Sequence, residues 1–216
     1  MKKVILATGT FFACLLWVST SAAISPEVIA IQQSWAAANY QLKGDDQDEA
    51  MQSLIDRCQN LLSSRPKDPE VLVWCGIVKS TYAGVLGGLS ALKYAKAARV
   101  DLQNAIDIEP GVMAGSAQTS LGTLYNKVPG WPLGFGSEKK ARALLLAGIE
   151  ASPTGIDSNY FYADFLYENG ELEKAHTHLL RALQAGDRAG RAVADEGRRA
   201  EIAVLLATIE TKLGED

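Results

Sequence analysis

Apolar residues recur along most of the chain at steps of three and four, which places them on one face of an α-helix. Leu54, Cys58 and Leu61 form one such stripe, and Leu72 and Cys75 begin another. No alternating apolar and polar pattern, the mark of a half-buried strand, interrupts them. The pattern predicts an all-α fold whose helices end at Pro66, Pro69, Pro110 and Pro153 and at Gly44, Gly111, Gly170, Gly186 and Gly214.

Four segments repeat the same steps of four, three and five residues. They are Leu54-Cys58-Leu61-Pro66, Ala98-Leu102-Ala105-Pro110, Ala141-Leu145-Gly148-Pro153 and Ala175-Leu179-Ala182-Asp187. Each segment predicts a helix that contains small residues and ends at the last residue of the segment. The helix that follows also contains a small residue in three cases: Gly76, Gly122 and Ala163. We expect small residues to face one another and let each hairpin close tightly. The predicted units lie near 26–66, 69–110, 112–153 and 156–187, with a closing helix over 194–213, in a single domain over 24–216.

The unit from Ile156 to Asp187 resembles the tetratricopeptide repeat, with Ala163 in its first helix, Asn169–Ala175 around its turn and Ala182 in its second helix. The resemblance implies a tetratricopeptide-like solenoid of antiparallel helical hairpins with a concave binding face and a C-terminal capping helix.

Two units are longer than the usual repeat of about 34 residues. Pro66 and Pro110 are 44 residues apart and Pro110 and Pro153 are 43 apart. The first excess surrounds Gly84, Gly87 and Gly88, and the second is the segment 128–136. Insertions of this kind are expected to project as loops, and such loops commonly carry binding sites.

The segment 128–136 contains two prolines, three glycines and the large apolar residues Trp131 and Phe135, and it follows Tyr125. Burying each ring would gain about 2 to 3 kcal/mol. One interpretation is a structural plug folded onto the solenoid. The other is a lid or rim that presents Trp131 and Phe135, with Tyr125 at its base, to a ligand or partner.

The residues around this segment carry a second resemblance. Gly122–Lys127, then 128–136, then Glu138–Arg142 are similar to the T-component family of tripartite (TRAP-type) periplasmic transporters. The resemblance implies an exported helical-repeat protein that can form a homo-oligomer and cooperate with a periplasmic solute-binding protein, holding an apolar ligand in a pore or groove.

A polar and aromatic cluster follows at Asn159, Tyr160, Tyr162 and Asp164, in the first helix of the last unit. These groups form neighbouring stripes on a helix. They could line a binding groove on the concave face, or they could form inter-helix hydrogen bonds, with Asn159 bracing the preceding segment. The charged stretch from Arg188 to Glu201 mixes both signs and favours a salt-bridged network over an anion site.

The first 23 residues have the organisation of a cleaved signal peptide. Lys2 and Lys3 precede an uncharged stretch over 4–18, and Ser21 and Ala23 fit the small-residue pattern of signal peptidase. The apolar stretch is about 15 residues, shorter than the roughly 20 that span a bilayer, which disfavours a transmembrane anchor. Lipid anchoring through Cys14 is disfavoured because the apolar run continues beyond that residue. We expect export to the periplasm.

Removing this segment changes the net charge from -4 to -6 and leaves Cys58 and Cys75. The acidic balance argues against nucleic-acid binding. In an oxidising compartment the two cysteines could form a disulfide across the break at Pro66–Pro69, and the alternative is two buried thiols.

No catalytic, metal or cofactor pattern is recognised in the sequence. His176 and His178 point about 200° apart on a helix, so they cannot share a metal ion, and both are expected at the surface. We therefore expect a non-catalytic protein that binds a periplasmic protein partner or small ligand, as an accessory of solute uptake. The alternative is an envelope scaffold or adaptor that mediates protein–protein assembly.

Overall fold

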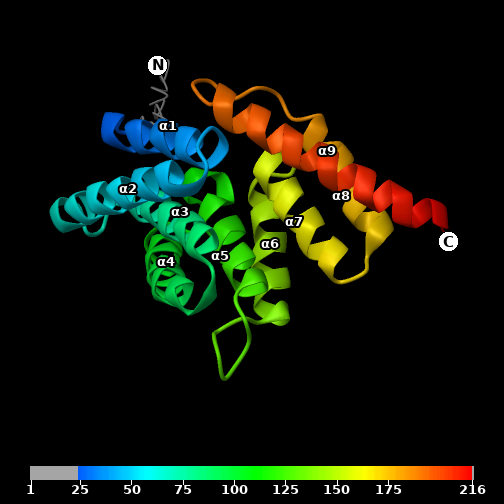
Figure 1. The fold of residues 1–216 in the computed structure, drawn as a ribbon, viewed down its shortest axis with the longest axis horizontal. Coiled ribbons are helices and arrows are strands. Elements are labelled where there is room, and N and C mark those ends of the chain that lie inside the picture. The colour runs from blue at the N-terminus through cyan, green and yellow to red at the C-terminus, as the bar shows by residue number, and fades with distance from the viewer. Residues whose placement is uncertain (1–23, 216) are drawn as a thin grey trace, which may run out of the picture.

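The structure is a computed structural model that describes residues 24–215. The described chain consists of helices joined mostly by short turns, with longer connections between α5 and α6 and between α8 and α9 (Figure 1). They are α1 (Pro26–Tyr40), α2 (Gly44–Ser64), α3 (Pro69–Leu86), α4 (Gly88–Ile108), α5 (Ser116–Lys127), α6 (Glu138–Ala151), α7 (Ile156–Glu168), α8 (Leu172–Leu183) and α9 (Ala192–Glu215), with a 3-10 turn, η1 (Val112–Gly115), before α5. The predicted signal peptide and Cys14 lie outside the described residues.

Several helices begin where the sequence supplies a capping side chain. Ser25 accepts a hydrogen bond from the backbone N–H of Val28, and Asp68 accepts from the N–H groups of Glu70 and Val71. Ser137 caps α6 in the same way. These side chains satisfy backbone donors that have no partner inside the helix, so they fix the start of each hairpin.

The helices pair in chain order as α1/α2, α3/α4, α5/α6 and α7/α8, and the first helices of successive pairs pack against one another. This arrangement confirms the predicted all-α solenoid of helical hairpins. None of the helices within 24–215 is long and apolar enough to cross a bilayer.

The small residues inside the hairpins allow the paired helices to approach closely, as expected, and they also make room for larger side chains. A Cβ atom at Gly76 would lie 2.6 Å from Cγ of Leu102, and one at Gly122 would lie 2.8 Å from Cγ of Leu145. At these positions the glycine lies against a leucine of the second helix and also against a small residue, since the same Cβ atoms would lie 3.4 Å from the carbonyl oxygen of Ala98 and 3.2 Å from that of Ala141. The missing side chain makes room for a large apolar group, which fills the space between the helices.

The first of the two insertions does not form a loop, which corrects the expectation from the sequence. The extra residues lengthen α3 and α4, which are 18 and 21 residues long, and only Gly87 separates the two helices. Gly87 and Gly88 have φ angles of 61° and 59°, in the region that favours glycine. The chain therefore reverses direction there without additional loop residues.

The C-terminal helix does more than cap the last hairpin. Besides α8 and α7, α9 contacts α1 at the other end of the chain, and Figure 1 shows the start of α9 beside α1. Ala194 is buried in the same apolar cluster as Val28, Trp35 and Trp74. The first and last helices are thereby joined, and the solenoid closes on itself.

Candidate functional site

The region where α9 meets α1 and α7 contains an ion-pair network. Asp157, in α7, pairs with Arg188 at 2.6 Å and with Arg198 at 2.8 Å. Arg188 also pairs with the buried Asp195 at 2.6 Å. Burial alone would raise the pKa of Asp157, but the charges of Arg198 and Arg188 outweigh it and lower the pKa to about 2. The charged stretch thus forms the predicted inter-helix network.

Aromatic rings surround the buried guanidinium of Arg198. It lies 4.4 Å from the ring centre of Tyr160 and 4.3 Å from that of Phe161. Burial, with Glu201 adding to it, raises the pKa of Tyr160 to about 12. Burial also raises the pKa of Tyr40 to about 12, despite the opposing charge of Arg198. Both phenols are therefore neutral at physiological pH.

Arg191, the residue before α9, belongs to a second group, which consists of buried hydrogen-bond donors that have no acceptor within residues 24–215. The guanidinium of Arg191 lies 5.0 Å from the ring centre of Trp74 in α3, and Trp74 packs edge-on against Trp35 of α1 at 5.8 Å. Gln32 lies one helical turn before Trp35. The Nε atom of Arg191, Nε1 of Trp74 and Nε2 of Gln32 are buried and have no hydrogen-bond partner within 24–215. Burial, and then repulsion from Arg188, lower the pKa of Arg191.

Unpaired buried donors are uncommon because each loses its hydrogen bonds to water. A carboxylate or carbonyl oxygen is the kind of group that accepts from such donors, and a carboxylate would also offset the charge of Arg191. We call Gln32, Trp74 and Arg191 the donor cluster. The cluster is not recognisable in the sequence, since its three members are distant along the chain. The only local signal was an arginine in the charged stretch.

The structure places Asn159 and Tyr162 inside the solenoid. Asn159 is fully buried, and its amide nitrogen donates to the carbonyl oxygens of Pro153 and Gly155, both at 2.9 Å. Its oxygen lies 2.9 Å from Nδ1 of His178, whose ring packs edge-on against Tyr162. Asn159 therefore braces the turn between the third and fourth hairpins.

His178 is half-buried by these contacts, so the expectation that it is a surface group was wrong. Burial, and then the charge of Arg181, lower its pKa. His176 lies 3.4 Å from Glu210 in α9. The described residues contain no group of three or more potential metal ligands.

Tyr160 and Asp164 have partners on neighbouring helices. Tyr160 packs against Arg198, as described above. The carboxylate of Asp164 lies 2.7 Å from Nζ of Lys127 at the end of α5, and Lys127 also pairs with Glu168 at 2.6 Å. These contacts tie the end of α5 to α7. The four clustered residues thus act here in inter-helix contacts, and none of them belongs to the donor cluster.

The two large rings of the segment 128–136 differ in exposure, because one packs against the protein and the other points into solvent. Phe135 packs edge-on against the buried Tyr125 at 5.5 Å and lies under the guanidinium of Arg99 at 4.4 Å. Trp131, in contrast, is 90% exposed. The position of Phe135 agrees with the plug interpretation, whereas the exposure of Trp131 agrees with the rim interpretation.

Cys58 and Cys75 are fully buried free thiols on the facing helices α2 and α3. The Sγ atom of Cys75 lies 3.8 Å from the carbonyl oxygen of Cys58. A hydrogen bond with Cys58, together with burial, raises the pKa of the Cys75 thiol. The disulfide therefore stays a prediction.

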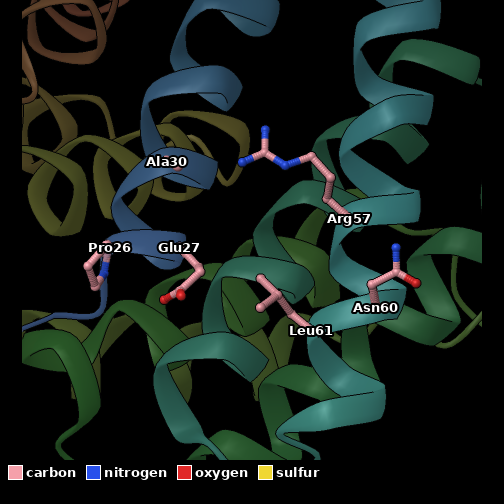
Figure 2. Close-up of a pocket in the computed structure, with 6 residues that line it drawn as sticks. All are labelled: Pro26, Glu27, Ala30, Arg57, Asn60 and Leu61. Atoms are coloured by element: carbon pink, nitrogen blue, oxygen red, sulfur yellow. The ribbon is translucent and has the colours of Figure 1, made fainter.

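Two surface hollows lie away from this junction. Figure 2 shows one between α1 and α2, of about 360 Å³, lined by Pro26, Glu27, Ala30, Arg57, Asn60 and Leu61. Its charged groups already have partners, since Arg57 donates to Ser34 at 3.0 Å and Glu27 pairs with Arg65 at 3.5 Å. The other, of about 400 Å³, is lined by Pro153, Thr154, Arg181 and Gln184. Neither contains an unpaired buried donor among the described residues.

The chain matches no protein-family model and no curated protein sequence. Its fold is similar to the structure of TTC0263, a thermophilic TPR protein in Thermus thermophilus, with a TM-score of 0.57 and 12% identity over 86% of this chain and 97% of that one. MamA (41-end) from Desulfovibrio magneticus RS-1 gives a TM-score of 0.46 and 16% identity over 89% and 96% of the two chains. The likeness to TTC0263 shows that the fold is tetratricopeptide-like.

Proposed function

We propose that this protein is an exported, non-catalytic helical-repeat protein that binds a partner segment or small ligand in the periplasm, as an accessory component of solute uptake. Export is supported by the signal-peptide pattern at residues 1–23. The uptake role is supported by the resemblance of residues 122–142 to the T-component family. That resemblance also implies a homo-oligomer and a solute-binding protein as partner.

The observation that carries the binding proposal is the donor cluster. Three buried donors from α1, α3 and the residue before α9 lack acceptors within 24–215, and one of them is a cation whose pKa is lowered by burial. A bound group with a carboxylate or carbonyl oxygen would remove this deficit. The apolar rings of Trp35 and Trp74 would pack against the rest of such a molecule.

The test is native mass spectrometry of protein purified from the periplasm without denaturation. We expect an added mass that corresponds to an acidic or carbonyl-containing molecule, and the same spectrum gives the oligomeric state. The variant Arg191→Gln removes the cation and is expected to reduce the bound fraction about tenfold or more. Arg181→Gln, an exposed arginine in α8, is the charge-matched control and should retain the molecule.

The outcome that contradicts the proposal is an Arg191→Gln protein that folds normally and retains the molecule as the wild type does. Protomers that are empty in both proteins also contradict it if they co-purify only with large envelope proteins. That result would favour the alternative, an envelope scaffold or adaptor that joins larger proteins. The alternative is supported by the tetratricopeptide-like fold, whose repeats form extended binding surfaces.

A further inference from the structure

The segment 128–136 holds two apolar side chains away from the protein at a convex tip. Trp131 is 90% exposed and Leu133 is 66% exposed, with Pro132 between them. Figure 1 shows this loop extending from the body of the molecule between α5 and α6. An exposed tryptophan next to an exposed leucine is an apolar surface with no partner within the described residues.

The loop is fixed at its base, so the tip is held in this position. The N–H of Gly136 donates to the carbonyl of Pro129 at 2.9 Å, and the N–H of Ser137 donates to the carbonyl of Tyr125 at 2.9 Å. Phe135 anchors the same base between Tyr125 and Arg99. One ring of the loop is thus partly buried against the protein, and the other is exposed.

The chain segments around the tip are rich in basic side chains, although the whole chain is acidic and two of these cations, Lys127 and Arg142, pair with carboxylates. Residues 127–142 contain four basic and one acidic side chain, and residues 84–100, around the start of α4, contain three basic and none acidic. The full chain has a net charge of -4. The two segments lie together because Arg99 of α4 packs on Phe135 of the loop.

Four of these cations are available for a partner. Lys96 lies one turn before Arg99 on α4, and Lys139 and Lys140 occupy the first turn of α6, immediately after the loop. The lysines are exposed. None of the four forms an ion pair within residues 24–215, although the guanidinium of Arg99 packs on the ring of Phe135 and Lys140 lies 5.1 Å from the ring centre of Tyr125. We call Trp131, Leu133, Lys96, Arg99, Lys139 and Lys140 the basic tip.

We propose that the basic tip docks on an anionic lipid bilayer, with Trp131 and Leu133 in the interfacial layer and the four cations over the headgroups. Tryptophan favours the membrane–water interface because its ring is apolar and its N–H is polar. Clustered lysines and arginines are attracted to the negative surface potential of such a bilayer. Two apolar residues at a convex tip suit a flat, deformable surface, whereas a protein partner would have to supply a matching pocket.

The fluorescence of Trp131 can report contact between the basic tip and a bilayer. Trp35 and Trp74 are 7% and 4% exposed, so Trp131 is the tryptophan whose surroundings would change on docking. Protein purified from the periplasm is mixed with vesicles of phosphatidylglycerol and phosphatidylcholine, or of phosphatidylcholine alone. With the anionic vesicles only, we expect the fluorescence emission of Trp131 to shift to shorter wavelengths and the protein to sediment together with the vesicles. High salt should weaken both effects.

Two double variants test separately the apolar and the electrostatic contributions to vesicle binding. Trp131→Ser with Leu133→Ser is expected to reduce vesicle binding about tenfold, and Lys139→Glu with Lys140→Glu by a similar factor. Val204→Ser, a 70% exposed residue of α9, and Lys67→Glu, an exposed lysine in the turn between α2 and α3, are the matched controls and should bind as the wild type. Because all substituted side chains are exposed, thermal melting should show that every variant folds.

Three results would overturn the proposal. They are no binding to anionic vesicles at low salt, equal binding to neutral vesicles, and unchanged binding of the Trp131→Ser, Leu133→Ser protein. Capture of an acidic protein that depends on Trp131, without vesicle binding, would assign the basic tip to a protein partner instead. The native mass spectra above are independent of this surface, so either proposal can fail without the other.

Discussion

The ring of Tyr40, the last residue of α1, lies against Gly197 in α9 so closely that a Cβ atom at position 197 would come within 2.3 Å of the ring. A glycine inside a helix is less favourable than alanine by roughly 0.5 to 1 kcal/mol. Its presence here is explained by the close approach of the first and last helices. This contact closes the solenoid beside the donor cluster.

Replacing Gly197 by alanine should therefore lower stability although it improves local helix propensity. We expect a loss of about 1 to 3 kcal/mol, because the ring of Tyr40 must move. Thermal melting and urea unfolding measure the change. Gly214→Ala is the control in the same helix, since a Cβ there meets nothing within 4 Å. In a Tyr40→Ala background Gly197→Ala should be neutral or stabilising, and an equal loss in both backgrounds would contradict the argument.

The ion pair between Lys79 of α3 and Asp101 of α4 is nearly buried, with side chains 12% and 13% exposed. Burial raises the pKa of Asp101 even though Lys79 opposes it. Lys79→Met leaves an uncompensated carboxylate and should destabilise the protein by about 3 kcal/mol or more.

The double variant Lys79→Met, Asp101→Leu should recover most of this loss, because both charges are then absent. Asp107→Asn, which affects an exposed carboxylate of the same helix, is the control. If the change in unfolding free energy of the double variant equals the sum of the changes for the two single substitutions, the two groups do not interact.

Cys58 and Cys75 are predicted to be oxidised in protein taken from the periplasm. Their disulfide would close a loop of about 18 residues and would stabilise the fold by about 3 kcal/mol in the chain-entropy model. Thiol labelling under denaturing conditions should find no free cysteine, and reductant should lower the melting temperature. The melting temperature of a Cys58→Ala, Cys75→Ala protein should not respond to reductant. Two labelled thiols in the untreated protein would rule out the disulfide.

The network around Asp157 predicts a loss of stability in acid. Folding lowers the pKa of this carboxyl from about 3.9 in an unfolded chain to about 2. The ionised group therefore contributes stability above about pH 4, and this contribution is lost as the pH falls toward 2. Because the side chain is 34% exposed, solvent screening limits the contribution to about 1 kcal/mol.

Urea unfolding at a series of pH values checks this expectation. Asp157→Asn should be less stable than the wild type near neutral pH, and the difference should shrink between about pH 4 and 2. Asp187→Asn is the matched control, since that side chain is 86% exposed and pairs only with Arg199 among the described residues. A constant difference across the pH range would show that ionisation of Asp157 is not the cause.

The sequence determined the helices, the hairpin units and the position of the second insertion. Helical periodicity, capping residues such as Asp68 and stops such as Pro110 act over a few residues, so they can be recognised without knowledge of the fold. The charged stretch before and within α9 was also recognisable as an ion-pair network, because it mixes both signs. These features are local, and the structure follows them.

Only the tertiary structure decided which side chains are buried, which are paired and which are left exposed. The sequence could not show that α9 returns to α1, that Arg191 meets Trp74, or that Phe135 packs against Tyr125 while Trp131 is exposed. It placed Asn159 and Tyr162 among candidate binding residues, yet both are buried in inter-helix contacts. The physical reason is that burial and pairing depend on how the hairpins twist and stack. Residues far apart in the chain meet only after that stacking is complete.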